Sequence, residues 1–521
     1  MAHSSLIPVS RPRLRSLNSC ENWFEHATLA DSSRASSAYL ALLDELEDAP
    51  PGPAVHLQVL ERLRLPILLA HKEDARRFAG KPLPLAYAEN AAFDQGCDLL
   101  LALQHAYQRL LRAALKGEPR ELEPSIALLC HRVLACSAEL IGACFLARRE
   151  VDSDAWQCLH EAYAIAEARG VTAAPVADGR GISNCTAAYV SPLLVHLAQP
   201  GGMPARELAW TRRWARRWAH KVRLDRDSPA QGGYAVDLGG DLGATWTKPG
   251  VHSDSLHFLD LSAVERSVNR RLHRLGKGAQ PAELGLGRHC TQPATGELLQ
   301  VLAGAWFAAP VAPAHRVGAS KTGMVIGLVA IHDAIDGKAI VRGTSQWDYS
   351  HRDAEQLHIF QRALEFAAKQ KHEPELENWE ALSESEAELC LRRKEPGARV
   401  ALRQLVAVRL HGAQQFIPCE VRWLAESANH VLTIGARALH GLARACAVRP
   451  VASGPTRTEL FSPALMLSAE VGRPPSLVLP SGWYQRARVI EIVLQKEVLR
   501  IRLFGLLSRG FDFDFVNFTA E

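Results

Sequence analysis

The chain has 521 residues, of which 47% are hydrophobic and 22% are charged, a composition typical of a globular protein with about three or four domains. Its formal net charge of +4 is too mild to indicate a nucleic-acid-binding protein. The eleven cysteines are scattered and form no C-x-x-C pair, which is the usage of a reducing compartment, so we expect a cytoplasmic protein. The longest apolar run, residues 324–331, is too short to cross a bilayer, and no membrane anchor is expected.

The first half of the sequence has the apolar periodicity of amphipathic helices. The expected helices cover residues 37–46, 54–78, 91–115, 123–149, 154–169 and 204–224. In the fifth of these, Trp156, Leu159 and Tyr163 have the spacing of the first helix of a tetratricopeptide repeat (TPR), although no second copy follows in register. Residues 1–225 are therefore expected to form a scaffold of TPR-like helical pairs that docks a protein partner.

The last of these helices carries a regular stripe of aromatic residues. Trp210, Trp214 and Trp218 recur every four residues and so share one face. Three arginines are expected to project from the opposite face: Arg212, Arg216 and Arg223. This pattern predicts buried tryptophans and arginines in solvent. Two other interpretations stay open, namely a basic surface for phosphates and a docking face for an acidic protein.

Glycine becomes more frequent in the middle of the chain, which predicts a small α+β domain at residues 226–350. A strand is expected at 234–238 and an amphipathic helix at 262–275, with Ser262 and Glu265 in the positions of a capping box. A second strand, residues 324–332, is expected to form a hairpin with residues 338–342.

Within this segment, the run YAVDLGGDLGAT at residues 234–245 resembles the first phosphate loop of the actin, sugar-kinase and Hsp70 ATPase superfamily. In that superfamily a strand ends in D-x-G-[GT]-T, and backbone amides of the loop cradle phosphate. Asp241 stands where a hydroxyl donor is expected, and no second phosphate loop follows. The competing interpretation is a strand and turn of purely structural role.

Other catalytic motifs are missing from the sequence. His160 and Glu161 open an H-E-x-x-H pattern that residue 164, an alanine, does not complete, and neither a P-loop nor a G-x-S-x-G elbow is present. We therefore expect no enzymatic activity, no metal site and no cofactor.

Residues 379–439 contain four consecutive runs in which apolar and polar residues alternate with period two, as in half-buried antiparallel strands. Turn residues such as Pro396-Gly397 separate the runs. The third run contains Val421-Arg422-Trp423 and the fourth contains Ile434-Gly435-Ala436-Arg437. This order predicts a small antiparallel barrel over residues 355–445, with six or seven strands and with Trp423 and Ile434 pointing inward.

These runs resemble the PilZ domain, the bacterial receptor module for cyclic di-GMP, whose late strands carry V-x-W and h-G-h-x-h motifs. The whole arrangement resembles large PilZ-related proteins of proteobacteria. In the family, a D/N-x-S-x-x-G box holds a guanine base, and an upstream R-x-x-x-R pair grips phosphates and bases. The resemblance thus implies cyclic di-GMP as the possible ligand of this chain.

The box falls at residues 383–388 and keeps only its serine, Ser385. Ser383 replaces the acid and Glu388 the glycine, and the upstream arginines Arg352 and Arg362 are ten residues apart. Each lost charged hydrogen bond costs roughly 1.5–3 kcal/mol, so two losses weaken binding by about a hundredfold or more. The residues expected to bind the ligand are Ser385, Arg362, Arg392 and Arg393.

The sequence thus predicts an α+β multidomain protein. Its four segments are a helical TPR-like scaffold (1–225), a small α+β domain (226–350), a PilZ-like antiparallel β-barrel (351–449) and a C-terminal β-rich unit (450–521). The favoured function is a non-enzymatic cytosolic signalling or scaffold protein with a degenerate nucleotide site. Two alternatives stay open: a functional cyclic di-GMP effector with an unconventional site, and an actin- or Hsp70-like ATPase.

Overall fold

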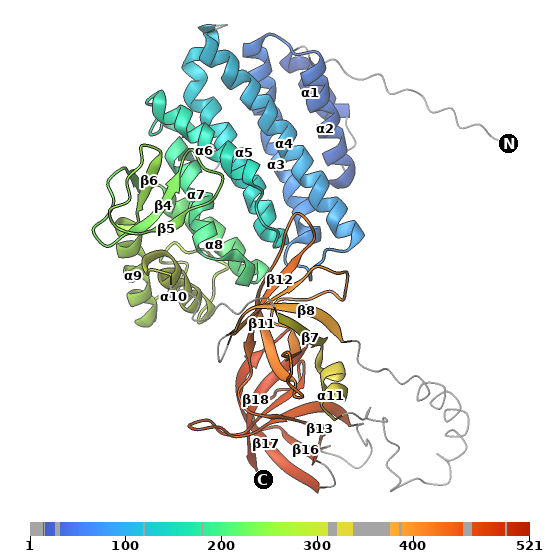
Figure 1. Cartoon of the computed structure of the whole chain (residues 1–521). Helices are drawn as coiled ribbons and strands as arrows, with labels where there is room; N and C mark the ends of the chain where they lie inside the picture. Colours follow the sequence, from blue (N-terminus) through green and yellow to red (C-terminus); the bar gives the residue numbers. More distant parts are fainter. Residues whose placement is uncertain are drawn as a thin grey trace, which may run out of the picture. The chain divides into compact units, whose positions relative to one another are not determined.

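The computed structural model describes residues 14, 16–26, 32–117, 120–179, 181–310, 320–336, 376–384, 388–451, 461–494 and 497–521. Its contacts divide the chain into two compact units. The first unit is Met1–Lys81 with Leu85–Val311, and the second is Pro82–Pro84 with Ala312–Glu521. Figure 1 shows helices along the first part of the chain and strands along the last.

The first unit begins with a run of helices that follows the predicted order. They are α1 (Leu17–His26), α2 (Ser32–Asp48), α3 (Pro53–Phe78), α4 (Tyr87–Lys116), the 3-10 helix η1 (Arg120–Ser125), α5 (Ile126–Ala147), α6 (Ser153–Ala168), α7 (Cys185–Leu197), the 3-10 helix η2 (Pro200–Gly202) and α8 (Ala205–Ala219). A short hairpin of β1 (Val176–Ala177) and β2 (Ile182–Ser183) precedes α7.

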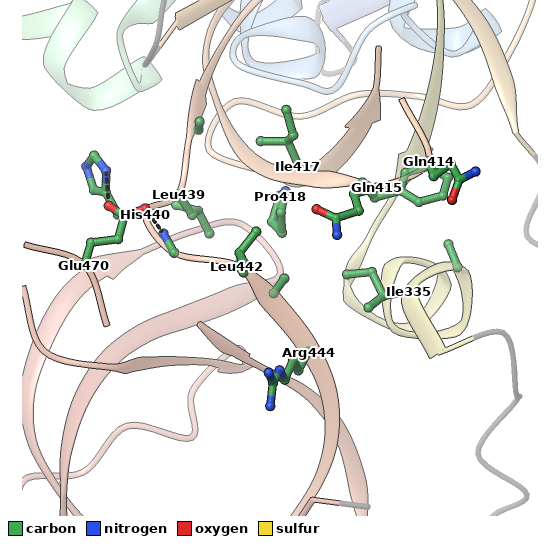
Figure 2. A pocket seen from close by; sticks show the side chains of 15 residues that line it. Ile335, Gln414, Gln415, Ile417, Pro418, Leu439, His440, Leu442, Arg444 and Glu470 are labelled. Atoms are coloured by element: carbon green, nitrogen blue, oxygen red, sulfur yellow. Dashed lines mark hydrogen bonds and ion pairs between the residues drawn. The ribbon is translucent and has the colours of Figure 1, made fainter. Parts of the chain in front are cut away.

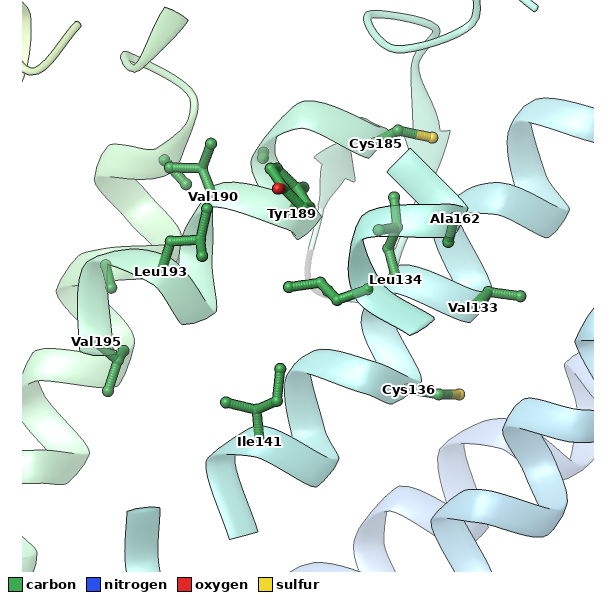
Figure 3. Packing of buried hydrophobic residues seen from close by; sticks show 14 of the residues in the cluster. Val133, Leu134, Cys136, Ile141, Ala162, Cys185, Tyr189, Val190, Leu193 and Val195 are labelled. Carbon is green, nitrogen blue, oxygen red and sulfur yellow. The ribbon is translucent and has the colours of Figure 1, made fainter. Parts of the chain in front are cut away.

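Helix α5 lies at the centre of this bundle and is apolar nearly all round, as a fully packed helix must be. Its side chains Leu134 and Ile141 lie in one hydrophobic cluster with Val190 and Leu193 of α7 (Figure 3). The stretch Arg120–Ala147 is long and apolar enough to cross a membrane, but 72% of its most apolar window is buried inside the protein. That degree of burial is typical of a core helix.

The first unit continues into a small antiparallel sheet of order β3-β6-β4-β5. Its elements are β3 (Arg223–Asp225), β4 (Gly233–Asp237), β5 (Thr245–Thr247), β6 (Leu256–Asp260), α9 (Ser262–Gly276) and α10 (Ala294–Phe307). The predicted strand and helix are confirmed, but α9 is capped by the carboxylate of Asp260, which accepts from the Ser262 N–H at 3.0 Å, and not by Ser262. Val236 and Val264 join the same hydrophobic cluster as the preceding helices, so this segment shares their core.

The second unit contains two closed barrels, each with six antiparallel strands. The first barrel has the order β10-β11-β12-β9-β8-β7. Its strands are β7 (Ser320–Ile326), β8 (Glu377–Glu384), β9 (Glu388–Arg393), β10 (Leu405–Arg409), β11 (Ile417–Glu426) and β12 (Leu432–Ala438). The predicted six-stranded antiparallel barrel is therefore confirmed, but its predicted bounds of 355–445 are wrong, because β7 lies before them.

The inward orientation predicted for Trp423 is wrong, whereas that for Ile434 is right. Ile434 is fully buried, but Trp423 remains 38% exposed. The cause is a β-bulge, because the pairing with β12 skips a residue between Val421 and Trp423, which turns two successive side chains outward. Outside the barrel, the indole packs against Gly435, where a Cβ atom would collide with it.

The hairpin predicted for residues 324–342 is also wrong in its first arm. Strand β7 ends at Ile326, and the apolar residues after it form α11 (Leu328–Asp336). Gly327, at φ +90°, makes the turn between the two elements. Residues 338–342 lie outside the described part of the chain. Strand β7 closes the first barrel although it lies in the segment expected to be a separate α+β domain.

The second barrel has the order β13-β14-β15-β18-β17-β16. Its strands are β13 (Ala443–Pro450), β14 (Ser462–Leu467), β15 (Ser476–Pro480), β16 (Val489–Leu494), β17 (Glu497–Arg509) and β18 (Phe513–Ala520). Phe513 and Phe515 are buried, but Phe511 is 59% exposed because it lies in the turn before β18. Helices in the first half, a mixed middle and antiparallel barrels at the end together confirm the α+β class. The four-segment domain division stays a prediction.

Candidate ligand-binding site

The two barrels share one hydrophobic core. Leu405 of β10, Ile331 of α11 and Phe513 of β18 belong to the same buried cluster. Backbone and carboxylate bonds reinforce the contact, since the Leu405 N–H donates to Asp512 at 2.9 Å and the Phe511 N–H donates to the Arg403 carbonyl at 2.7 Å. Burial raises the pKa of the Asp512 carboxyl. The barrels therefore form one packed body, and surfaces at their junction are defined by both.

Only four residues, 439–442, connect the last strand of the first barrel to the first strand of the second. The Leu439 N–H donates to the Pro418 carbonyl at 2.8 Å, and the Gly441 N–H donates to the Glu470 carboxylate at 2.9 Å. Gly441 has φ +96°, and a Cβ atom on it would clash with the Ser468 carbonyl. Glycine is thus required here, and the connection is held by both barrels.

Two adjoining cavities border this connection. Figure 2 shows the larger one. The larger has a volume of about 740 Å³ and the smaller about 450 Å³. They share four lining residues, Ala438, Leu439, His440 and Glu470. The larger one is also bordered by α11 through Ile335, and by Gln415, Leu442 and Arg444, as Figure 2 shows. We call the two cavities together the inter-barrel cleft. Each of the two cavities has a volume in the range of small-molecule sites.

Four arginines line the cleft, together with the carboxylates of Glu420 and Glu470. Arg444 borders the larger cavity, and Arg422, Arg437 and Arg473 border the smaller one. Arg422 pairs with Glu420 at 3.2 Å and Arg437 with Glu388 at 2.8 Å. In the described residues, no carboxylate lies within ion-pair distance of Arg444 or Arg473. Two guanidinium groups are therefore available to an anion, and planar guanidinium is suited to phosphate and to base edges.

The other polar groups of the cleft fit a ligand with hydrogen-bonding edges. His440 lies 3.8 Å from the Glu470 carboxylate. The remaining donors and acceptors are the side chains of Gln414, Gln415, Ser468, Ser476, Ser508 and Asn517. Apolar contacts come from Leu439, Leu442, Leu507 and Phe515. The cleft thus combines positive charge, amide and hydroxyl groups and apolar walls, which a nucleotide with phosphates and bases requires.

Two of the predicted ligand residues, Arg392 and Arg393, are held by carboxylates of the first barrel. Arg392 pairs with Glu380 at 2.7 Å, which lowers the pKa of that carboxyl. Arg393 is 4% exposed, pairs with Glu377, donates to the Ala398 carbonyl at 3.0 Å and lies 5.0 Å from the Trp379 ring. Binding a nucleotide through either guanidinium would require displacing a carboxylate.

The register of the barrel separates these arginines from the cleft. On β12, Arg393 lies opposite Leu432, whereas Glu388 lies opposite Arg437, which borders the cleft. Arg393 lies five positions after Glu388 on the strand, so the two residues are about 17 Å apart. Glu388, the last residue of the box, therefore lies at the cleft end of β9, and Arg392 and Arg393 lie toward its other end. The remaining predicted ligand residues, Ser385 and Arg362, lie outside the described residues, as does Arg352.

Sequence reasoning missed Arg444, Arg473 and Arg422 as site residues. Arg422 stands inside the V-x-W motif, so a closer consideration of outward-facing motif positions could have found it. No local pattern marks Arg444 or Arg473, because the second barrel brings them to the cleft only through its own strand order.

The tryptophan stripe of α8 is buried, which confirms half of that prediction. Trp210, Trp214 and Trp218 are 1–3% exposed. The arginine half is wrong for Arg212, which pairs with Glu139 of α5 at 2.8 Å and is only 18% exposed. Arg216 pairs with the same carboxylate at 2.6 Å but remains 39% exposed. Arg223 is 78% exposed, as predicted.

The motifs of the first unit that resemble catalytic ones have structural partners. The Asp237 carboxylate accepts from the Gly239 N–H at 2.9 Å, which closes its own turn. A hydrogen bond from Ser255, together with the bond from Gly239, lowers the pKa of this carboxyl. His160 is fully buried between the Tyr189 hydroxyl, at 2.7 Å, and the Leu242 carbonyl, at 2.9 Å. Over the described residues, no group of three or more metal-ligating side chains is found.

Comparison with known families gives two matches. Residues 18–230 match the model described as cyclic-di-GMP receptor FimW, N-terminal domain. Residues 446–520 match the model described as FimW C-terminal beta-barrel domain. The second match covers the second barrel almost exactly from β13 to β18, and the first barrel lies between the two matched segments. The searches among curated proteins and among solved structures gave no match.

Proposed function

Since this chain belongs to the FimW family of cyclic-di-GMP receptors, we propose that it is itself a receptor that binds cyclic di-GMP in the inter-barrel cleft. The observation that carries the proposal is the family match at both ends of the chain. The cleft supports its location, because it offers two arginines without carboxylate partners in the described residues and a volume of about 740 Å³ in its larger cavity.

Chemical complementarity supports the same site. Cyclic di-GMP presents two phosphates, which suit Arg444 and Arg473, and two guanine bases, whose edges suit amide and hydroxyl groups such as Gln415, Ser468 and Asn517. Glu388, the last residue of the box, adjoins this cleft through its pair with Arg437. This pair offsets the charge of Glu388, so the substituted box does not by itself exclude an anionic ligand.

Of the alternatives from the sequence, this proposal favours a cyclic di-GMP effector with an unconventional site over a scaffold whose barrel binds no nucleotide. The residues that would hold the ligand are those of the cleft and not Arg392 or Arg393, which already hold carboxylates. We further propose that the protein is non-enzymatic and cytoplasmic, and that the helical unit transmits the signal by docking a protein partner. The self-capped turn at Asp237 gives no support to the ATPase alternative.

Isothermal titration calorimetry of the full chain tests the proposal, with cyclic di-GMP as the ligand and cyclic di-AMP as the matched control. Both ligands carry the same phosphates, so a specific receptor binds the first at micromolar concentration or below and the second at least tenfold more weakly. Equal binding of the two would indicate charge attraction alone, and absence of binding by either at about 100 μM, roughly 5.5 kcal/mol, would favour the scaffold.

A further inference from the structure

A line of basic side chains runs along one face of α8, in the helical unit, which contributes no residue to the cleft. Arg206, Arg213 and Arg217 are exposed, and since they are seven and four residues apart they share this face. Lys221, also exposed, follows just after the helix ends. The eleven residues from Arg206 to Arg217 place these charges over about 17 Å of helix.

Helix α9 adds two more cations at the end of this line. Lys221 Nζ and Arg271 Nη1 both donate to the Ser267 hydroxyl, at 3.1 and 2.6 Å, so the two cations are neighbours. Partial burial lowers the pKa of Lys221, and the charges of three arginines lower it further: Arg271, Arg217 and Arg270. We call the whole set the α8–α9 basic strip, made up of Arg206, Arg213, Arg217, Lys221, Arg270 and Arg271.

The strip differs from the neighbouring arginines in having no counter-charge. Arg212 and Arg216, also on α8, pair with Glu139, and Arg223 pairs with Asp260 at 2.9 Å. Within the described residues, no carboxylate lies within ion-pair distance of any member of the strip. Like charges gathered in this way repel one another and destabilise the folded chain. A partner that carries the opposite charge would remove this repulsion.

A loop after α9 holds two of the guanidinium groups in place. Arg217 donates to the Gly285 carbonyl, and Arg271 Nε donates to the Leu284 carbonyl at 3.2 Å. Gly285 has φ +68°, and a Cβ atom on it would collide with the Arg217 guanidinium, so glycine is required at this contact. Because a guanidinium group has five N–H donors, each arginine keeps donors for a ligand while its position is fixed.

The buried tryptophans of α8 support the strip from below. The Arg206 guanidinium lies 4.7 Å from the centre of the Trp210 ring, and that of Arg271 lies 5.7 Å from the Trp218 ring. Cation–π contacts of this kind restrict the side chains further. Binding through groups that are already ordered loses less conformational entropy than binding through free side chains.

The strip presents charge without apolar surface. Over α8 and α9, both fully described, no large apolar side chain is exposed, and the three tryptophans are 1–3% exposed. A site for single-stranded nucleic acid needs exposed aromatic rings on which bases stack. A helix that binds a membrane needs an apolar face that inserts between lipids. A partner that binds through a line of charges alone fits these two helices better.

We propose that the α8–α9 basic strip docks an acidic helix of a protein partner. Carboxylates three or four residues apart on a helix follow one another at about 5–6 Å on one face, which is the spacing of the cations on α8. The inference rests on the proposed function in one respect, because it gives the chemistry of the protein partner proposed there for the helical unit. It requires no ligand in the cleft.

Fluorescence anisotropy with the full chain and a labelled synthetic peptide tests this proposal. The probe has about 20 residues, enough to form a helix, and consists of alanine and glutamine with glutamates at alternating spacings of three and four, all on one face. A scrambled peptide of the same composition is the control for the spacing. At low ionic strength, where screening is weak, we expect micromolar binding of the probe and about fivefold weaker binding of the scrambled peptide.

Two double variants test the location. Lys221→Glu with Arg270→Glu reverses two exposed charges of the strip and is expected to weaken probe binding about tenfold or more. Lys72→Glu with Arg112→Glu is the matched control, because it makes the same change in net charge at two exposed residues of α3 and α4. The control should stay within about twofold of the wild type. Circular dichroism checks that both variants are folded.

The proposal is overturned if the probe does not bind at low ionic strength or if the two double variants weaken it equally. It is also overturned if a DNA duplex of about 20 base pairs, or vesicles of phosphatidylcholine and phosphatidylserine in equal parts, bind more tightly than the probe, since the partner would then carry phosphates. Failure of the cleft is a separate observation, because a wild type that binds no cyclic di-GMP can still bind the probe.

Discussion

The arginines of the first barrel's strand β9 and those of the inter-barrel cleft are in different electrostatic states. Arg392 and Arg393 are held by Glu380 and Glu377 of the same barrel. In the cleft, Arg444 of β13 and Arg473 of the turn before β15 have no carboxylate within ion-pair distance in the described residues. The difference teaches that closeness to a sequence motif does not make an arginine available to a ligand. Availability depends on whether the fold has already provided a counter-charge.

The largest expected effect is the loss of stability when Arg393, which already holds a carboxylate, is removed. Arg393→Ala leaves Glu377, which is 13% exposed, buried without its partner. Removing one member of a buried pair destabilises a protein by about 3–5 kcal/mol. Chemical denaturation should therefore show a large drop in the stability of the second unit. A loss of cyclic di-GMP affinity with unchanged stability would instead assign Arg393 to the ligand.

Gly441→Ala tests whether the connection between the barrels shapes the cleft. The new Cβ atom would clash with the Ser468 carbonyl at φ +96°, and we expect a destabilisation of about 1–3 kcal/mol together with weaker cyclic di-GMP binding. Gly472→Ala is the matched control, because its φ is +78° but a Cβ atom meets nothing within 4 Å. If the two variants bind the ligand equally well, the connection has no part in the site.

Restoring the PilZ box tests how the cleft end of β9 affects cyclic di-GMP affinity. Ser383→Asp with Glu388→Gly removes the carboxylate that pairs with Arg437 and returns a carboxylate acceptor near the cleft end of β9. We expect cyclic di-GMP affinity to rise about tenfold, the value of one charge-assisted hydrogen bond. Titration of wild type and variant side by side measures the change, and a weakened variant would mean that the Arg437–Glu388 pair supports the site.

The smallest effect is expected for Arg392→Ala. This guanidinium is one-third exposed, and Glu380 keeps a second partner in Lys394 at 3.1 Å. Such pairs contribute little because solvent screens them. Thermal unfolding should show a change in Tm far below that of Arg393→Ala, and ligand binding should stay at the wild-type level. A large shift in either would show that the pair is tightly coupled to Arg393.

Much of the fold follows from local patterns in the sequence. Period-two alternation correctly predicts β8 to β12, and helical periodicity predicts the bundle, because one face of each element must be buried. The inward orientation predicted for Trp423 is wrong because a bulge interrupts the alternation at that residue, and no pattern of apolar residues reveals a bulge. The strand predicted where α11 begins is wrong for another reason, since a short apolar run does not distinguish strand from helix.

The site is less predictable than the fold. The PilZ resemblance indicates the ligand class, and the last residue of its box, Glu388, lies opposite Arg437 at the proposed cleft. Arg444 and Arg473 could not be found, because they come from β13 and from the turn before β15, and only the packing of two barrels on a shared core brings them beside Arg422 and Arg437. A contact between strands of different barrels has no local sequence signal.

Calorimetric titration of cyclic di-GMP into the Arg444→Ala, Arg473→Ala double variant tests the central claim most directly. The control is Arg502→Ala, an arginine of the second barrel that pairs with Glu521 and does not line the cleft. Removal of two charge-assisted bonds should weaken the double variant by about a hundredfold or more, while the control binds as the wild type does. Wild-type affinity in the double variant would contradict a ligand site between the barrels.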